Sequence, residues 1–162
     1  PDIILVGEIR DKDTAEMAFR AAMTGHQVFT TLHTNSALGV FPRLMDIGIQ
    51  PGILSGNIIG VVAQRLVRKL CPHCKEPDPT VGGWRAVGCG HCGHTGYLGR
   101  TGIYELLTVN DEIRMLVHQG SNDADMRRVA EKNGMISMRA DAQRWIKTGV
   151  TSQEETLRVT RE

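Results

Sequence analysis

Two Cys-x-x-Cys pairs constrain the fold of this chain more than any other feature of its sequence. Cys71 and Cys74 are followed, after fourteen intervening residues, by Cys89 and Cys92. Two thiolates on one tight turn hold a metal ion from one side, and a second pair completes a tetrahedron around it. The pattern therefore predicts a Cys₄ zinc site, with a spacing one residue shorter than the usual range. Because four thiolates leave no open coordination position, we expect the zinc to be structural rather than catalytic.

The segment that carries these cysteines cannot build a hydrophobic core by itself. Residues 71–96 contain six Gly and three Pro and show neither helical nor strand periodicity. Metal binding would therefore supply the folding free energy of this segment. The alternative is four inert or adventitiously oxidised thiols. His73, His91 and His94 lie among the cysteines, and we expect them to be solvated side chains because the coordination shell is already complete.

Two apolar runs before the cysteines predict strands of an α/β fold. Residues 2–7 form a β-branched run typical of a buried parallel strand, and Glu8 follows its carboxyl end. Residues 28–32 predict a second buried strand, with His26 and His33 just outside its two ends. Helical spacing between and after these runs favours a layered α/β structure with a parallel sheet.

Helices and further strands are expected along the rest of the chain. Asp13 is the expected N-cap of the first helix, and Asn35 or Ser36 that of the second. Residues 53–70 predict a helix leading into a strand, and residues 99–109 return to strand-like alternation. The tail then predicts helices near 110–119, 123–133, 137–148 and 152–159.

Composition excludes several classes of protein. A chain of 162 residues with a net charge of +1 lacks the excess of basic residues typical of nucleic-acid binding. Its apolar runs are too short for a helix that spans a membrane. The sequence shows no basic leader of a signal peptide, and because it opens on Pro1 we expect a piece of a longer chain.

The usual ATP-binding loop is missing from these residues. That loop has the pattern Gly-x-x-x-x-Gly-Lys-Ser/Thr, and none of the five lysines follows a glycine. Ligands of open α/β sheets gather at the carboxyl ends of strands, where Glu8 and His33 are expected. The residue types and their positions leave two interpretations open. Glu8 and His33 form a site for a ligand or a water molecule, or they are an ordinary solvated glutamate and histidine.

Several segments of the chain resemble the ATPases of type II secretion and type IV pilus assembly. Residues 1–11 are similar to the Walker B segment of that family, and residues 24–26 with 31–34 are similar to its histidine box. The resemblance continues in order through residues 64–72, 96–105 and 151–155. The four cysteines favour these ATPases over the pilus retraction ATPases, which lack the metal loop.

The resemblance implies a fold and a set of site residues. The chain would be the C-terminal portion of a RecA-like P-loop ATPase domain, with a Cys₄ zinc loop and an α-helical C-terminal subdomain. Glu8 would be the Walker B acid that positions or activates the attacking water. His26 and His33 would be the histidine-box residues near the γ-phosphate, and Arg10 would support nucleotide binding. ATP and Mg²⁺ would be the cofactors of the complete protein, because phosphoryl transfer needs a placed water and neutralised charge.

The resemblance also implies a division of the chain. Residues 1–70, completed by strands in 97–109, would belong to the ATPase domain. Residues 71–96 would be the tetracysteine metal-binding subdomain, and residues 110–162 the helical C-terminal subdomain. Because the phosphate-binding loop would lie upstream, we expect the isolated chain to be inactive. We also expect part of its sheet edge to be unpaired and apolar, which invites association.

The function implied for the complete protein is that of a homo-hexameric motor. Its ATP hydrolysis would drive pseudopilus or pilus assembly and type II protein secretion, with the residues around the cysteines favouring secretion. The motor would be cytoplasmic and peripheral at the bacterial inner membrane, and it would contact the membrane only through platform proteins. No nucleic-acid partner is expected. The alternative is a zinc-ribbon module that binds protein or nucleic acid and has no ATPase activity.

Overall fold

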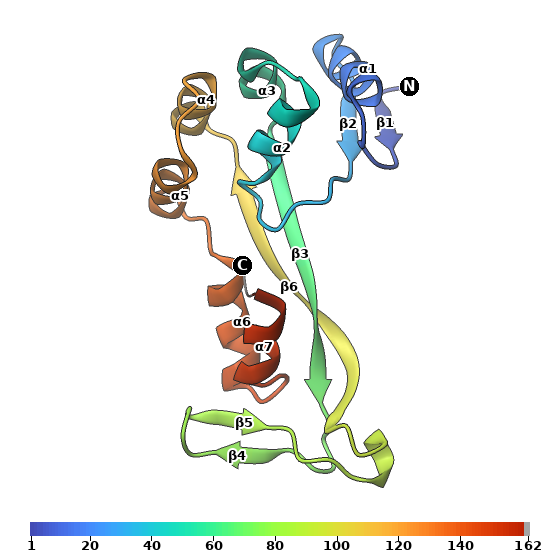
Figure 1. Ribbon diagram of the computed structural model, residues 1–162, viewed down its shortest axis with the longest axis vertical. Coiled ribbons are helices and arrows are strands. Elements are labelled where there is room, and N and C mark those ends of the chain that lie inside the picture. The colour runs from blue at the N-terminus through green and yellow to red at the C-terminus, as the bar shows by residue number, and fades with distance from the viewer. Residues whose placement is uncertain (161–162) are drawn as a thin grey trace. The chain divides into compact units, whose positions relative to one another are not determined.

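A computed structural model describes residues 1–160 and shows a mixed α/β fold (Figure 1). The strands pair two by two: β1 (Ile3–Val6) with β2 (Gln27–Thr30), β3 (Gly60–Leu70) with β6 (Tyr97–Thr108), and β4 (Glu76–Asp78) with β5 (Gly83–Arg85). The helices are α1 (Lys12–Met23), α2 (Val40–Ile47), α3 (Pro51–Asn57), α4 (Asp111–His118), α5 (Asp123–Lys132), α6 (Met138–Lys147) and α7 (Gln153–Thr160), with a short 3₁₀ helix η1 (Gly90–Cys92). Within residues 1–160, no helix has the length and apolar character needed to cross a membrane.

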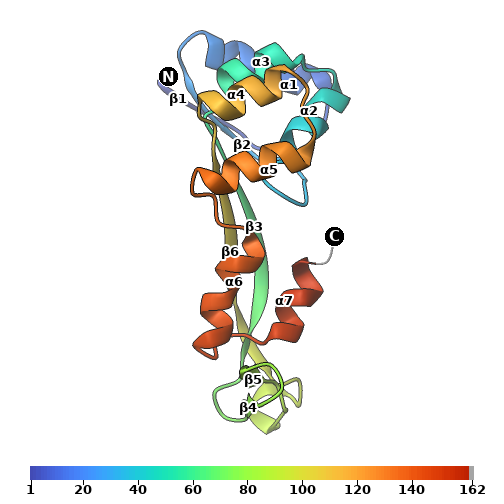
Figure 2. The same ribbon diagram turned by 90° about the vertical axis from the view of Figure 1, so that its left-hand side faces the viewer.

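The chain divides into two compact units. The first comprises residues 1–62 and 106–135, and the second comprises residues 63–105 with the described residues from 136 on. Helices α4 and α5 belong to the first unit, whereas α6 and α7 belong to the second (Figure 2). The β3–β6 pair runs through both units.

Among the described residues, the expected parallel sheet is limited to two strands. β1 and β2 are parallel, with Leu5 opposite Phe29. β3 and β6 instead run side by side in opposite directions (Figure 1). The chain turns back between these two strands through residues 71–96, and such a return joins antiparallel strands without a helical crossover.

One face of the β1–β2 pair is half-buried and the other is exposed. Leu5 is 76% exposed, and Ile3 and Phe29 are exposed as well, whereas Ile4 and Val28 are half-buried. The prediction of two buried strands is therefore wrong for one face of this pair. Within residues 1–160, β1 and β2 pair only with each other, so each has an unpaired edge, and the exposed apolar side chains lie on one face of the pair. Association through this apolar part of the sheet stays a prediction.

Two helix starts differ from the predicted ones. The N-cap of α1 is Asp11, whose carboxylate accepts the backbone N–H of Thr14, so Asp13 lies inside the first turn. There its negative charge still interacts favourably with the positive end of the helix dipole. Helix α2 begins at Val40 rather than directly after Ser36. The Ser36 hydroxyl still accepts the N–H of Gly39, a cap-like bond in the turn that precedes the helix.

The predicted helices of the tail are confirmed to within about two residues. Helices α5 and α6 begin after Asn122 and Ser137, whose side chains accept backbone N–H groups of the first turn. Short polar side chains before apolar helical patterns are reliable start signals because they satisfy donors that have no partner inside the helix. Residues 71–96, by contrast, have no strand periodicity in the sequence, yet the structure forms the β4–β5 hairpin there.

A small apolar core holds the second unit together. Val67 of β3 and Ile103 of β6 pack against Met138 and Ala142 of α6. Trp145 is partly buried against this cluster, and its indole N–H donates to the carbonyl of Gly102. The inward-facing residues of β3 and β6 follow the alternation that a half-buried pair requires.

A buried carboxylate ties α7 to β3. The Glu155 side chain is fully buried and accepts hydrogen bonds from the guanidinium groups of Arg68 and Arg158, as well as from the Arg68 backbone N–H. The Arg68 guanidinium lies 4.0 Å from the centre of the Tyr97 ring, and the Tyr97 hydroxyl lies 2.7 Å from that of Ser152. Burial alone would raise the pKa of Glu155, but the bonds from Arg158 and Arg68 outweigh it and lower the pKa to about 2.

We expect Glu155→Gln to destabilise the chain by about 3 kcal/mol, because it leaves two arginines without their counter-charge. The pKa gives a similar figure, since a carboxyl whose pKa falls from 4.5 to about 2 on folding contributes about 3 kcal/mol. This stability is present above the ordinary pKa of a glutamate and is lost as the pH falls toward 2. Urea unfolding as a function of pH measures it. The neighbouring Glu154 is exposed, and Glu154→Gln is the matched control. Equal stability of the two variants would contradict the assigned role.

Candidate functional site

The ends of β1 and β2 stay connected beyond the last residues of the two strands. The backbone N–H of Ile9 donates to the carbonyl of Thr31 over 3.0 Å, and the Thr31 hydroxyl donates to the carbonyl of Gly7 over 2.6 Å. These bonds keep the two emerging segments side by side. They bring Glu8, which follows β1, next to His33, which follows β2.

Glu8 lies between the guanidinium of Arg10 and the imidazole of His33. Its Oε2 lies 2.7 Å from Nη2 of Arg10, and its Oε1 lies 2.8 Å from Nε2 of His33. The Glu8 side chain is 22% exposed, whereas those of Arg10 and His33 are 76% and 88% exposed. The Arg10 contact is the largest influence on the pKa of Glu8, which lies below its ordinary value; the His33 contact lowers it further. Glu8 also raises the pKa of Arg10.

The structure brings together three of the four residues implied for nucleotide chemistry. His26 precedes β2, so the four residues of that strand separate it from the end where Glu8 and His33 meet. Its Nδ1 lies 3.1 Å from the carbonyl of Ala21 and 3.2 Å from the hydroxyl of Thr24, at the end of α1. Within this chain, His26 therefore contacts the end of α1 rather than Glu8.

The Glu8 cluster can perform two kinds of chemistry. A carboxylate with a lowered pKa is ionised at neutral pH and can orient a water molecule or accept its proton. The exposed guanidinium of Arg10 and the imidazole of His33 can donate to an anionic group such as a phosphate. Both capacities lie at the carboxyl ends of parallel strands, the usual ligand-binding edge of an α/β sheet.

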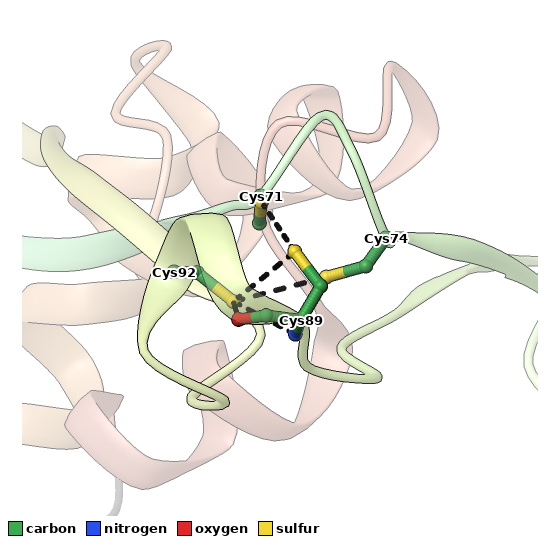
Figure 3. A group of neighbouring side chains, drawn as sticks. All are labelled: Cys71, Cys74, Cys89 and Cys92. Carbon is green, nitrogen blue, oxygen red and sulfur yellow. Dashed lines mark hydrogen bonds between the residues drawn. The ribbon is translucent and has the colours of Figure 1, made fainter.

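The four cysteines converge on one point (Figure 3). Their Sγ atoms all lie within 4.8 Å of one another, and three of the pairs are 3.9 Å apart. Four sulfurs that each lie about 2.3 Å from one tetrahedral ion are about 3.8 Å from one another. The cysteines come from two turns, one directly after β3 and one around η1. The donor set and its spacing therefore fit a tetrahedral thiolate metal site.

Backbone N–H groups surround the sulfur atoms. Gly88 donates to Sγ of Cys74, while Cys89 and Gly96 donate to Sγ of Cys92. Burial alone would raise the pKa of Cys92, but the N–H groups of Cys89 and Gly96 outweigh it and lower the pKa to about 6. At Cys74 burial dominates and raises the pKa to about 12. Donors aimed at sulfur favour the thiolate form that a metal ion needs.

The histidines of this loop lie outside the sulfur cluster. The rings of His73 and His91 stack with their centroids 4.2 Å apart, and both residues are exposed. Among the described residues, the group that could hold a metal ion consists of the four cysteines alone. His94 is exposed and has a positive φ of 62°.

Two structural features were missed in the sequence. The side-chain bond from Thr31 to Gly7 joins residues 24 positions apart, and the bonds from Arg68 to Glu155 join residues 87 positions apart. No local pattern predicts either bond, although Thr31 and Glu155 lie within the segments that resemble secretion ATPases.

Comparisons with known proteins agree on one family. The family model described as "Type II/IV secretion system protein" matches residues 1–158. The type II secretion system protein HxcR of Pseudomonas aeruginosa is 56% identical over the whole chain, which covers 34% of that protein. The type II secretion system ATPase E of Vibrio cholerae is 44% identical over the whole chain, which covers 35% of it.

A solved structure shows the same fold. The crystal structure of the pilus retraction motor PilT with bound ADP matches 100% of this chain, and the match covers 40% of the PilT chain. The TM-score is 0.72 and the sequence identity is 31%. This chain spans about a third of the length of HxcR and of the Vibrio cholerae ATPase E.

Proposed function

The chain belongs to the type II/IV secretion system protein family, and we propose that it is the C-terminal part of a motor ATPase that drives type II secretion or pilus assembly. The contact of Glu8 with Arg10 and His33 carries this proposal. It places an ionised carboxylate, a guanidinium and an imidazole at one strand edge, where a phosphoryl-transfer site needs a placed water and compensated charge. Relatives named as secretion ATPases over the same residues support it.

We propose that Glu8 positions or activates the attacking water and that His33 and Arg10 interact with Glu8 and with phosphate oxygens. His26 stays a candidate for a role near the γ-phosphate. ATP and Mg²⁺ would bind with the help of a phosphate-binding loop outside this chain. The functional division proposed is an ATPase part over 1–70 with 97–109, a metal loop over 71–96 and a helical C-terminal part from 110 on.

Zinc is the metal proposed for the four cysteines. Cys71, Cys74, Cys89 and Cys92 would hold it, and a closed thiolate shell would supply structure rather than reactivity. Its binding would stabilise a loop whose apolar content is low, and the backbone N–H groups that donate to Sγ of Cys92 support the thiolate state of that residue.

The assembled protein is proposed to be a hexamer at the cytoplasmic face of the inner membrane. Platform proteins would link it to the membrane, and secretion is favoured over pilus assembly. A zinc-ribbon module without ATPase activity remains the second candidate. It accounts for the cysteines but not for the contacts of Glu8. The family match also extends far beyond the metal loop, over residues 1–158, which favours the motor.

The isolated chain should neither bind ATP tightly nor hydrolyse it, because no lysine in it follows a glycine as a phosphate-binding loop requires. The complete gene product should do both. Calorimetric titration with ATP and a phosphate-release assay on the two proteins measure the difference. Tight binding of ATP by residues 1–162 alone would contradict the proposal.

A further inference from the structure

We propose that Thr31 is a positioning residue for the carboxylate of Glu8, an inference that rests on the ATPase function proposed above. Thr31 bonds to the peptide units on both sides of Glu8. Its hydroxyl donates to the carbonyl of Gly7 over 2.6 Å, and its carbonyl accepts the N–H of Ile9 over 3.0 Å. One residue of the neighbouring segment thereby fixes the backbone immediately before and immediately after the carboxylate.

The two flanks of Glu8 differ in what else restrains them. Ile9 is 4% exposed, so packing of its side chain anchors the backbone after Glu8. Gly7 has no side chain to pack, and a Cβ placed on it would meet no atom within 4 Å. Glycine also has more backbone freedom than any other residue. The Thr31 hydroxyl therefore restrains the flank that packing leaves free.

The contacts of the Glu8 side chain hold its carboxylate less firmly than the bonds from Thr31 hold the backbone of Glu8. Arg10 and His33 touch its oxygens, but their own side chains are 76% and 88% exposed. Exposed ion pairs contribute little free energy and hold two mobile side chains weakly. Positional accuracy must then come from the backbone of Glu8. Thr31 also lies two residues before His33, so the same backbone anchor sets the approach of His33 to Glu8.

Replacement of the hydroxyl should lower turnover more than nucleotide binding. Thr31→Val in the complete gene product keeps the shape of the side chain and removes the donor. We expect kcat for ATP to fall about ten- to a hundredfold, since a shift of about 1 Å in a catalytic group costs about a hundredfold. KM for ATP should stay within about twofold, because positioning of the base affects the chemical step rather than binding.

Three further variants isolate the hydroxyl. Thr31→Ser keeps the donor and should retain kcat to within about threefold, and Thr31→Ala should behave like Thr31→Val. The neighbouring Thr30 is exposed, and Thr30→Val is the matched control for loss of a threonine hydroxyl at this strand end. If the Thr31→Val protein does not fold or does not form the proposed hexamer, the comparison of Thr31→Ala with Thr31→Ser gives the same test.

The results separate this inference from the proposed function. Glu8→Gln is measured in the same series. If Glu8→Gln retains turnover, the proposed function fails whatever Thr31 does. If Glu8→Gln abolishes turnover and Thr31→Val has the kcat of the unmodified protein, the inference about Thr31 is overturned. Equal losses in Thr31→Ser and Thr31→Ala, or a rise in KM without a fall in kcat, would also overturn it.

Discussion

Glu8→Gln in the complete gene product should leave ATP binding intact and lower turnover by about a hundred- to ten-thousandfold, the usual contribution of a positioned acid or base. Glutamine has nearly the same shape, but it cannot accept a proton from water. Glu8 lies beside Arg10 and His33 at the strand edge. Because activation of the attacking water belongs to the chemical step, the loss should appear in kcat rather than in nucleotide affinity. Steady-state phosphate release together with equilibrium binding of a labelled ATP measures both quantities.

The matched control for this variant is Glu16→Gln. Glu16 lies on α1 and pairs with Lys12 and Arg20 on the surface of the helix, away from the strand edge. Exposed helix pairs of this kind contribute only about 0.3–0.5 kcal/mol, so its turnover should be unchanged. Turnover in Glu8→Gln equal to that in Glu16→Gln would show that Glu8 is not the water-activating group.

Metal removal should have the second large effect. We expect one zinc ion per chain, and Cys71→Ser should lose it and unfold the loop over residues 71–96. Structural zinc sites contribute apparent binding free energies of about 10–16 kcal/mol in small domains, more than this loop can recover from packing. The loop contains only the short β4–β5 hairpin and η1, and a two-stranded hairpin is marginally stable by itself. Elemental analysis and limited proteolysis of the loop measure the two consequences.

His73→Ala tests the closed shell of the same site. The His73 ring stacks on that of His91 outside the sulfur cluster, so this variant should keep its zinc. Zinc content that falls in His73→Ala as it does in Cys71→Ser would make the histidine a ligand and contradict the four-cysteine site. A protein prepared with no bound metal and an intact loop would contradict the structural role of zinc.

Local signals in the sequence predicted much of the fold and of the candidate site. The helices of the tail follow from caps such as Asn122 and Ser137, because cap and pattern act within one turn of the chain. Spacing alone predicts that the four cysteines converge on one metal ion, because tetrahedral coordination leaves few ways to place two Cys-x-x-Cys turns. The two apolar runs predict that Glu8 and His33 each follow the carboxyl end of a strand, and the structure adds that their side chains meet there.

Long-range relations were beyond the sequence. The buried bond between Arg68 and Glu155 depends on the packing of α7 against β3, which no local pattern encodes. The apolar run of β1 indicates burial on both faces of the sheet. Leu5 and Phe29 are nevertheless exposed, because no element of the described residues covers their face. The bond from Thr31 to Gly7 depends on the register of β1 and β2.

The coding sequence upstream of Pro1 tests the central claim most directly. A motor ATPase requires a Gly-x-x-x-x-Gly-Lys-Ser/Thr loop on a strand-to-helix turn, and we predict one roughly 60–70 residues before Glu8. Its presence would join the phosphate-binding loop to the carboxylate, arginine and histidine described here. An open reading frame without that loop would contradict the motor function and leave a metal-binding module as the remaining function of this chain.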